Sequence, residues 1–245
     1  MKAVTGFKLL YKALLKHDEW SAFTIAERFT KLVYPRYKFS EFGRIYLRDE
    51  AFIRTYEHFS GRNNYHALDR RYALDQLTKM VTHIEGDTAE CGAYKGDSSY
   101  LICRRTAGLQ KQHHVFDSFE GLSTPAPQDG TYWSRGDLAI GEEAIHEGLK
   151  EFDFVVYHKG WIPEKFHEVE GRKFCMIHLD VDLYQPTLDS LRFFFDRMSP
   201  GGLILCDDYG FQTCPGAKEA CDSFFSDKLE KVVSLPTGQG FVLKR

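Results

Sequence analysis

The second half of the chain alternates short apolar runs with segments in which apolar residues recur at helical spacing. Strand-like runs lie at 88–93, 113–118, 154–158, 174–179 and 203–206, and helical segments begin near 98 and cover 140–151, 187–198 and 217–225. Strands that alternate with helices are typical of a parallel sheet with helices on both faces. Two last strand-like runs, 231–235 and 240–244, flank a turn that contains Pro236 and Gly238 and predict an antiparallel hairpin. We therefore expect a mostly parallel, doubly wound sheet with one antiparallel strand.

The first part of the chain, residues 1–85, lacks this alternation and is predicted to form helices and loops. The clearest helix covers 67–83, where Leu68, Tyr72 and Leu77 recur at helical spacing. We expect a single domain over residues 1–245. In this interpretation a helical N-terminal extension at 1–85 covers a core at 86–245 that is built from alternating strands and helices.

The N-terminal segment is amphipathic, because Phe7, Leu10 and Leu14 recur at helical spacing while Lys8 and Lys12 lie on another face. A helix that packs on the domain or on a partner subunit explains this pattern best, so we expect a homo-oligomer. A basic helix at a membrane surface is the alternative interpretation. The chain has no apolar run of about 18 residues, so no membrane span is expected.

The composition narrows the class of protein. Of 245 residues, 43% are hydrophobic and 27% are charged, which is enough for a large core and a hydrated surface. The formal net charge of -3 does not suggest binding to nucleic acid. The six cysteines form no CxxC pair, and they are interpreted as small buried side chains in a reducing cytoplasm. Neither a disulfide framework nor a zinc site is expected.

A glycine-rich turn follows the first predicted strand, in the sequence AECGAYKGDSS. Glu90 ends the strand, and Gly92 and Gly96 allow the backbone to approach a ligand closely. Their spacing differs from the Gly-x-Gly-x-x-Gly of dinucleotide sites, in which a helix N-terminus binds pyrophosphate. A ligand with an amino-acid end and a positively charged sulfonium fits an acidic Glu90 better. An ordinary glycine-rich turn between strand and helix explains the motif equally well.

A second carboxylate, Asp117, ends the second predicted strand within VFDSFEGL, and Ser118 follows it. In a strand–helix–strand unit, a carboxylate at this place accepts hydrogen bonds from the ribose hydroxyls of a bound nucleoside. The alternative is a solvated acidic residue in a turn. Because Asp117 occurs together with the glycine turn, the ribose role is favoured, and Ser118 is included in the predicted cofactor site.

Four aspartates follow two neighbouring apolar strands, in the sequences KFCMIHLDVD and GGLILCDDY. Asp180 and Asp182 end the first, and Asp207 and Asp208 end the second. Ligands of open α/β sheets bind outside the carboxyl ends of the strands, and carboxylate oxygens are the ligands that Mg²⁺ prefers. The preceding His178 is interpreted as a core residue and not as a ligand. A role in turns or caps is the alternative for Asp207 and Asp208.

Together, these stretches resemble the macrocin O-methyltransferase family, which methylates sugar hydroxyls of natural products with S-adenosylmethionine and a divalent metal. The matching stretches run from residue 86 to about 225 in the family's order: GDTAECGAYKGDS, VFDSFEGL, KGWI, LDVDLYQPT, SPGGLILCDDY and PGAKEACDSF. The resemblance implies a class I methyltransferase-like Rossmann fold. It also implies an S-adenosylmethionine-dependent O-methyltransferase that acts on a hydroxyl of a sugar or glycosylated natural product, with Mg²⁺ or another divalent cation.

The resemblance assigns roles to the four aspartates. Asp180, Asp207 and Asp208 match the metal carboxylates of the family. Asp182 matches the second aspartate of the family's Asp-Gly-Asp motif, which implies the general base. Asp180 is therefore expected to bind the cation, and Asp182 to act on the proton of the acceptor.

The resemblance also assigns the cofactor residues. Glu90, Gly92 and Asp117 match the cofactor turn and the ribose carboxylate. Two positions depart from the family pattern, because Val181 replaces the usual glycine and Pro186 replaces a usual serine. Both lie beside the aspartates, where they can reshape the acceptor side while leaving the carboxylates in place.

The segment 123–137 matches the family least, and it carries Tyr132 and Trp133 between prolines and glycines. We expect it to form, with parts of the N-terminal region, a mobile cover that stacks on a sugar ring. A nucleotide- or nucleotide-sugar-binding protein without methyl transfer is the alternative function, because Mg²⁺ held by aspartates also suits phosphates. Against that alternative, the chain has no P-loop motif.

Overall fold

The computed structural model describes residues 2–35, 44–61 and 67–245, which fall into two compact units, Met1–Ile53 and Arg54–Arg245. The first unit contains α1 (Lys2–Leu15), α2 (Glu19–Val33) and the 3-10 helix η1 (Ile45–Arg48). The boundary between the two units therefore lies inside the N-terminal extension predicted at 1–85. Residues 36–43 and 62–66 of that extension lie outside the described residues. No helix in the described ranges is long and apolar enough to cross a bilayer.

Helix α2 begins where an aspartate caps it. The carboxylate of Asp18 accepts a hydrogen bond of 2.9 Å from the backbone N–H of Ser21. Such a cap satisfies one of the N–H groups that have no partner inside the helix. The expected single domain, the homo-oligomer and the covering role of this region stay predictions.

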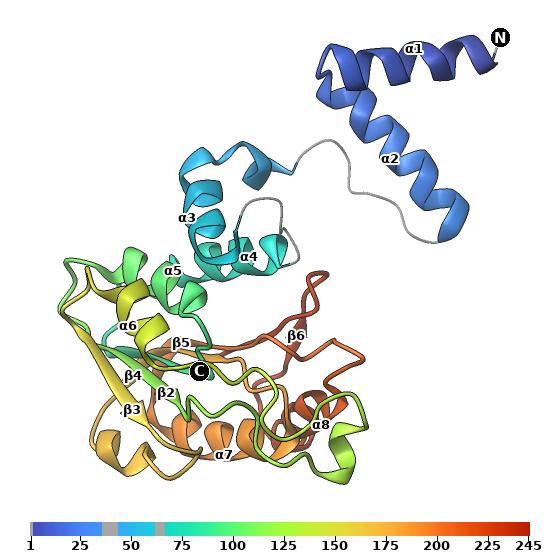
Figure 1. Cartoon of the computed structure of the whole chain (residues 1–245). Helices are drawn as coiled ribbons and strands as arrows, with labels where there is room; N and C mark the ends of the chain where they lie inside the picture. Colours follow the sequence, from blue (N-terminus) through green and yellow to red (C-terminus); the bar gives the residue numbers. More distant parts are fainter. Residues whose placement is uncertain (1, 36–43, 62–66) are drawn as a thin grey trace. The chain divides into compact units, whose positions relative to one another are not determined.

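The second unit is built on a seven-stranded sheet with the order β3-β2-β1-β4-β5-β7-β6 (Figure 1). The first five strands along the chain are parallel, and β7 is antiparallel to both of its neighbours. This confirms the predicted doubly wound sheet with one antiparallel strand. The strands are β1 (Asp87–Cys91), β2 (His113–Asp117), β3 (Val155–Lys159), β4 (Phe174–Leu179), β5 (Met198–Cys206), β6 (Val233–Ser234) and β7 (Gly240–Leu243).

Helices cover both faces of the sheet in the second unit. Helices α7 and α8 pack together along one face, and α5 and α6 lie on the other (Figure 1). Helix α3 (Glu50–Ser60) crosses the boundary between the two units. The others are α4 (Leu68–Thr78), α5 (Asp97–Thr106), α6 (Glu143–Leu149), α7 (Tyr184–Phe194) and α8 (Pro215–Phe224), with the 3-10 helices η2 (Pro127–Asp129), η3 (Phe166–Val169) and η4 (Phe195–Arg197).

Most element boundaries lie within a few residues of the predicted ones, and α7 shows why they move. The helix begins at Tyr184, before the predicted start at 187, and so contains Pro186. Proline is tolerated in the first helical turn, because an N–H at that place has no partner within the helix. Pro186 therefore belongs to the first turn of α7 and does not lie in the loop before it.

The strand order reverses between β1 and β4, since β2 and β3 extend to one side and β5 to the other. At such a switch point the connections leave in opposite directions and a crevice opens at the carboxyl ends of the strands. The predicted cofactor residues lie at or just after the ends of β1 and β2, and the predicted metal residues follow β4 and β5. The fold therefore brings both groups to one edge of the sheet.

A buried carboxylate joins α4 to α5. Asp75 has no exposed surface and forms ion pairs with Arg104 at 2.8 Å and Arg105 at 2.5 Å. Burial alone would raise the pKa of Asp75, but the hydrogen bonds from Arg105 and Arg104 outweigh it and hold that pKa below its usual value. The carboxylate is thus charged in the folded state.

We expect Asp75→Asn to lower the free energy of unfolding by ~2–3 kcal/mol near pH 7, because breaking a buried pair leaves uncompensated partners. A carboxylate with a lowered folded-state pKa stabilises the fold above its unfolded pKa of about 4, and this contribution is lost as the pH falls through the folded value. The difference between wild type and variant should therefore persist down to about pH 5 and shrink below about pH 4. Urea unfolding over this pH range measures it.

The matched control is Asp227→Asn, since Asp227 is 81% exposed and pairs with Lys228 at the surface. Its unfolding midpoint should equal that of the wild type. A difference between Asp75→Asn and wild type that is as large at pH 3 as at pH 7 would contradict the assignment to the carboxylate charge.

Candidate functional site

The ends of four parallel strands lie at one level, because the register of the sheet aligns them. Cys91 of β1 pairs with Phe116 of β2 and with Leu179 of β4, and Leu179 pairs with Cys206 of β5. The residues that follow these four positions therefore leave the sheet side by side. They begin with Gly92, Asp117, Asp180 and Asp207, which are four of the residues predicted from the sequence.

A cavity of about 550 Å³ opens over these strand ends. Two of the predicted site residues, Glu90 and Asp207, are fully buried and do not belong to its lining. The other predicted residues line it: Gly92, Asp117, Ser118, Asp180, Asp182 and Asp208. The structure therefore brings cofactor and metal candidates into one space.

Gly92 allows the turn after β1 to touch the end of β4. Its φ is +79°, and an added Cβ would lie 2.0 Å from the carbonyl oxygen of Asp180. The backbone N–H of Asp180 in turn donates to the carbonyl of Cys91 at 2.9 Å. Any side chain at position 92 would push the two strand ends apart, so only glycine fits here.

Asp117 shapes the turns around it while it faces the cavity. Its Oδ2 accepts the N–H groups of Ala93 at 2.8 Å and Tyr94 at 3.2 Å, and its Oδ1 accepts the N–H of Phe119 at 2.7 Å. A carboxylate oxygen can accept two hydrogen bonds, so Oδ1 retains capacity for a ligand. The hydroxyl of Ser118 accepts the N–H of Glu120 at 3.0 Å. Both side chains are fixed at the rim of the cavity.

Glu90 lies beneath the cavity. Its carboxylate accepts hydrogen bonds from the hydroxyls of Ser98 and Ser99, and one of 2.7 Å joins it to Nδ1 of His178. Burial alone would raise the pKa of Glu90, but the hydrogen bond from His178 outweighs it and the pKa is lowered. The carboxylate is therefore held inside the protein, and its contact with an amino-acid end of a cofactor stays a prediction.

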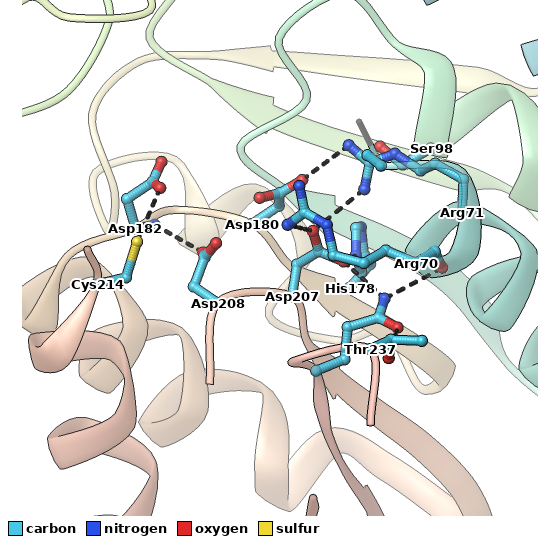
Figure 2. Close-up of polar contacts among 12 residues, drawn as sticks. Arg70, Arg71, Ser98, His178, Asp180, Asp182, Asp207, Asp208, Cys214 and Thr237 are labelled. Carbon is cyan, nitrogen blue, oxygen red and sulfur yellow. Dashed lines mark hydrogen bonds and ion pairs between the residues drawn. The ribbon is translucent and has the colours of Figure 1, made fainter. Parts of the chain in front are cut away.

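Asp207 is held by four side chains and has no exposed surface (Figure 2). Arg70 and Gln239 donate to its carboxylate at 2.6 and 2.7 Å, and Arg71 and His178 lie at 3.3 Å. Burial alone would raise the pKa of Asp207, but the charges of both arginines and the hydrogen bond from His178 lower it well below its usual range. Its negative charge is already balanced within the protein.

The other three aspartates have less positive charge beside them than Asp207, with Arg71 3.3 Å from Asp180. Burial and the charge of Asp207 raise the pKa of Asp180 to about 7. Burial raises the pKa of Asp182 to about 6, against a hydrogen bond from Cys214. Burial and the charges of Asp182 and Asp180 raise the pKa of Asp208 well above its usual value. Carboxylates that repel one another in this way favour a proton or a cation between them.

These side chains fit a divalent cation, although not as a single compact set. The possible ligand atoms lie within 4.8 Å of one another in two groups, one of His178, Asp180 and Asp207 and one of Asp182, Asp208 and Cys214. Asp208, predicted as a ligand with Asp180 and Asp207, thus lies in the second group (Figure 2). Oxygen donors dominate both groups, which is the chemistry that Mg²⁺ prefers.

Asp182 adopts a backbone conformation that is rare outside glycine, with φ at +58°. Aspartate is one of the side chains that tolerate this region. The backbone N–H of Asp182 donates to Asp208 at 3.0 Å, and the thiol of Cys214 donates to its Oδ1 at 3.3 Å. Within the described residues, its Oδ2 has no hydrogen-bond partner. That oxygen is available to a ligand in the cavity.

Aromatic side chains line the rest of the cavity, and Tyr132, Trp133, Trp161 and Phe211 are among them. They come from the segments after β2, β3 and β5. Flat apolar faces next to a charged floor suit a ligand that has both ring surfaces and hydroxyl groups.

The segment 123–137 is fastened to the core. The carboxylate of Asp129 accepts the N–H groups of Tyr184 at 2.6 Å and Ala126 at 2.7 Å. It also lies so close to the head of α8 that a Cβ on Gly216 would approach it to 1.9 Å. A second fastening joins the indole N–H of Trp133 to the Sγ of Cys214 at 3.3 Å. Tyr132 and Trp133 of the segment line the cavity, and its role as a mobile cover stays a prediction.

Sequence reasoning missed several members of the site, among them Arg70, Arg71 and Cys214. Arg70 and Arg71 belong to the predicted helix before β1, whose periodicity indicates burial but not a contact with Asp207 or Asp180. Their adjacent positive charges next to a buried face were the available signal. Cys214 gave no signal, because a lone cysteine before a helix is usual in cores.

Known relatives share this arrangement of sequence. The 8-demethyl-8-(2,3-dimethoxy-alpha-L-rhamnosyl)-tetracenomycin-C 4'-O-methyltransferase of Streptomyces olivaceus is 27% identical over 154 residues, which cover 57% of this chain and 59% of that protein. The demethyldecarbamoylnovobiocin O-methyltransferase of Streptomyces niveus is 26% identical over 188 residues, which cover 66% of this chain and 68% of that protein. The chain thus spans about three fifths of the first relative and about two thirds of the second.

Solved structures share the fold. The O-methyltransferase NovP superposes with a TM-score of 0.61 at 21% identity, covering 78% of this chain and 88% of its own. The calicheamicin methyltransferase CalS11 superposes with a TM-score of 0.65 at 16% identity, covering 92% and 93%. These similarities confirm the predicted class I methyltransferase fold. The sequence profile of the macrocin-O-methyltransferase (TylF) family matches residues 64–232, well over half of the chain, and the chain therefore belongs to this family.

Proposed function

We propose that this protein is an S-adenosylmethionine-dependent O-methyltransferase that acts on a hydroxyl of a sugar or glycosylated natural product and uses a divalent cation such as Mg²⁺. The observation that carries the proposal is the single cavity lined by both the glycine turn with Asp117 and the carboxylates of Asp180, Asp182 and Asp208. A methyl donor and a hydroxyl acceptor must share one space for the transfer. The named activities of the relatives, which are sugar-modifying or natural-product O-methyltransferases, point the same way.

The cofactor half of the site would lie over β1 and β2. Gly92 lets a ligand approach the backbone, Asp117 has free acceptor capacity for ribose hydroxyls, and Ser118 lies beside it. Trp161 lines the same cavity after β3, where its ring would flank an adenine. S-adenosylmethionine supplies a methyl group on a positively charged sulfur, which leaves with the electron pair of the broken carbon–sulfur bond.

The acceptor half would lie over β4 and β5. Asp182 would take the proton of the acceptor hydroxyl at its free Oδ2, while the hydroxyl oxygen forms the new bond to the methyl carbon. Tyr132, Trp133 and Phe211 would hold the ring faces of the acceptor and exclude water. Positioning of this kind supplies on the order of 7–11 kcal/mol of a barrier.

The metal part of the proposal rests on unbalanced charge. Asp180 and Asp208 would hold the cation at the cavity floor, with Asp207 behind Asp180 as the third carboxylate. Arg71 lies 3.3 Å from Asp180 and would have to move or share that carboxylate. A divalent cation supplies positive charge that favours loss of the proton from a nearby hydroxyl.

Binding of S-adenosylhomocysteine tests the cofactor site. The wild-type protein should bind it by titration calorimetry, and Asp117→Ala should weaken binding by ~1.5–3 kcal/mol through loss of charge-assisted hydrogen bonds. Asp117 also accepts backbone N–H groups, so the thermal unfolding of each variant is measured beside its affinity.

Asp153→Ala is the matched control, because Asp153 is an exposed aspartate outside the cavity. It should bind S-adenosylhomocysteine like the wild type. Unchanged affinity in a well-folded Asp117→Ala protein would remove Asp117 from the site. Binding of nucleotide sugars without any binding of S-adenosylhomocysteine would favour the nucleotide-sugar-binding alternative.

Chelation tests the cation. EDTA should abolish methyl transfer and added Mg²⁺ should restore it, because the repulsion among Asp180, Asp182 and Asp208 is relieved by a cation. Calorimetric titration of Mg²⁺ into the complex with S-adenosylhomocysteine gives a second measure that needs no acceptor. Full activity after exhaustive chelation would reject the metal part and leave the methyltransferase proposal standing.

The two aspartates that follow β4 should behave differently. Asp180→Asn should weaken Mg²⁺ affinity and lose rate mostly through that loss. Asp182→Asn should bind Mg²⁺ and cofactor nearly normally while methyl transfer falls by ~10²–10⁴-fold, the usual contribution of a positioned general base. Higher pH should partly restore its rate, because hydroxide in solution can then take the proton. Metal titration and single-turnover kinetics of both variants decide the matter, and equal losses of Mg²⁺ affinity would make Asp182 a ligand.

A further inference from the structure

Cys214 lies between two parts of the cavity that come from distant parts of the chain. It directly precedes α8, is 3% exposed, and lines the cavity. Its Sγ accepts the indole N–H of Trp133 at 3.3 Å, and its thiol donates to Oδ1 of Asp182 at 3.3 Å. The side chains of Trp133, Cys214 and Asp182 therefore form one chain of hydrogen bonds, from the aromatic wall to the proposed general base.

This chain leaves only one oxygen of Asp182 free. Asp182 lines the cavity, Cys214 donates to its Oδ1, its backbone N–H is bound to Asp208, and its Oδ2 has no protein partner in the described part of the chain. A carboxylate whose Oδ1 is fastened also holds its Oδ2 in a defined direction. Without that bond the carboxylate can rotate, and a misplaced base loses rate even when binding is intact.

The thiol is suited to this place. Its S–H is a weak donor, and at 3.3 Å it donates to Oδ1 of Asp182. Sulfur also forms long, weak hydrogen bonds that leave the carboxylate basic. Its neighbour Thr213 approaches the same sulfur at 3.6 Å.

We propose that Cys214 is a positioning residue that orients Asp182 for proton transfer. Through Cys214, the orientation of the Asp182 carboxylate depends on the position of the Trp133 side chain. This inference rests on the proposed function in so far as it concerns the rate, but the orientation of Asp182 is a property of the folded chain alone. The inference gives the segment 123–137 a second role besides contact with the acceptor. When the indole of Trp133 donates to Cys214, the thiol is fixed in place and the carboxylate of Asp182 is directed into the cavity.

The first arm of the test needs no acceptor. Crystal structures of the wild type, Cys214→Ala and Cys214→Ser are determined in complex with S-adenosylhomocysteine. We expect Asp182 to leave its orientation in Cys214→Ala and to regain it in Cys214→Ser, which keeps a donor and an acceptor at this place. Trp133→Phe, which keeps a ring but loses the N–H, should loosen the thiol and give a partly displaced Asp182. An unchanged Asp182 in Cys214→Ala overturns the inference.

The second arm measures methyl transfer to 4-nitrophenyl α-L-rhamnoside as a probe acceptor. Cys214→Ala should lower kcat about tenfold, which corresponds to one hydrogen bond to a charged group, with KM and the affinity for S-adenosylhomocysteine nearly unchanged. Cys214→Ser should recover most of the rate. A serine variant as slow as the alanine variant counts against the positioning role.

Cys221→Ala is the matched control, since Cys221 is a buried cysteine of α8 outside the cavity lining. It should keep the kcat of the wild type, which separates loss of a buried thiol from loss of this thiol. Asp182→Asn is assayed beside these variants. If Asp182→Asn is fully active, the assigned base fails. If Asp182→Asn is slow while Cys214→Ala turns over normally with Asp182 in place, only the positioning role fails.

Discussion

Asp207 carries a carboxylate with no exposed surface, and an isolated charge in that position would strongly destabilise the fold. The protein balances it with two arginines from α4, a histidine from β4 and a glutamine next to β7. These four partners come from parts of the chain that are far apart in sequence. The charge of one aspartate therefore ties the helix before the sheet to the ends of β4 and β5 and to the start of β7.

The consequence extends to the cavity floor. Arg70 pairs with Asp207 at 2.6 Å, and Arg71 divides its charge between Asp97 at 2.6 Å and Asp207 and Asp180 at 3.3 Å, so little positive charge remains for Asp182 and Asp208. His178 extends this network to β1, because its two ring nitrogens form hydrogen bonds with Asp207 and with Glu90. One buried polar network thus runs beneath both halves of the proposed site, and rigidity in one half is shared with the other.

The sheet and most of the site could be predicted from sequence because their signals are local. Alternation of apolar runs with helical segments determines a parallel sheet, and an aspartate after an apolar run marks a strand end. The partition of the four aspartates could not be predicted. Adjacent residues such as Asp207 and Asp208 differ in surroundings only through tertiary contacts, here Arg70 on one side and the cavity on the other. Glu90 illustrates the same limit, because its serine and histidine partners depend on strand register.

The close contact between Asp129 and Gly216 has a consequence for exchanging acceptor preference between relatives. The carboxylate of Asp129 occupies the space that a side chain at position 216 would need. A loop grafted from this protein therefore brings a steric requirement that lies elsewhere in the chain, at the head of α8. In a chimera that receives segment 123–137 alone, a host residue larger than glycine at the start of the α8 helix will prevent Asp129 from packing there. The loop will then not adopt its position. The smallest exchangeable unit is the loop together with the first turn of α8.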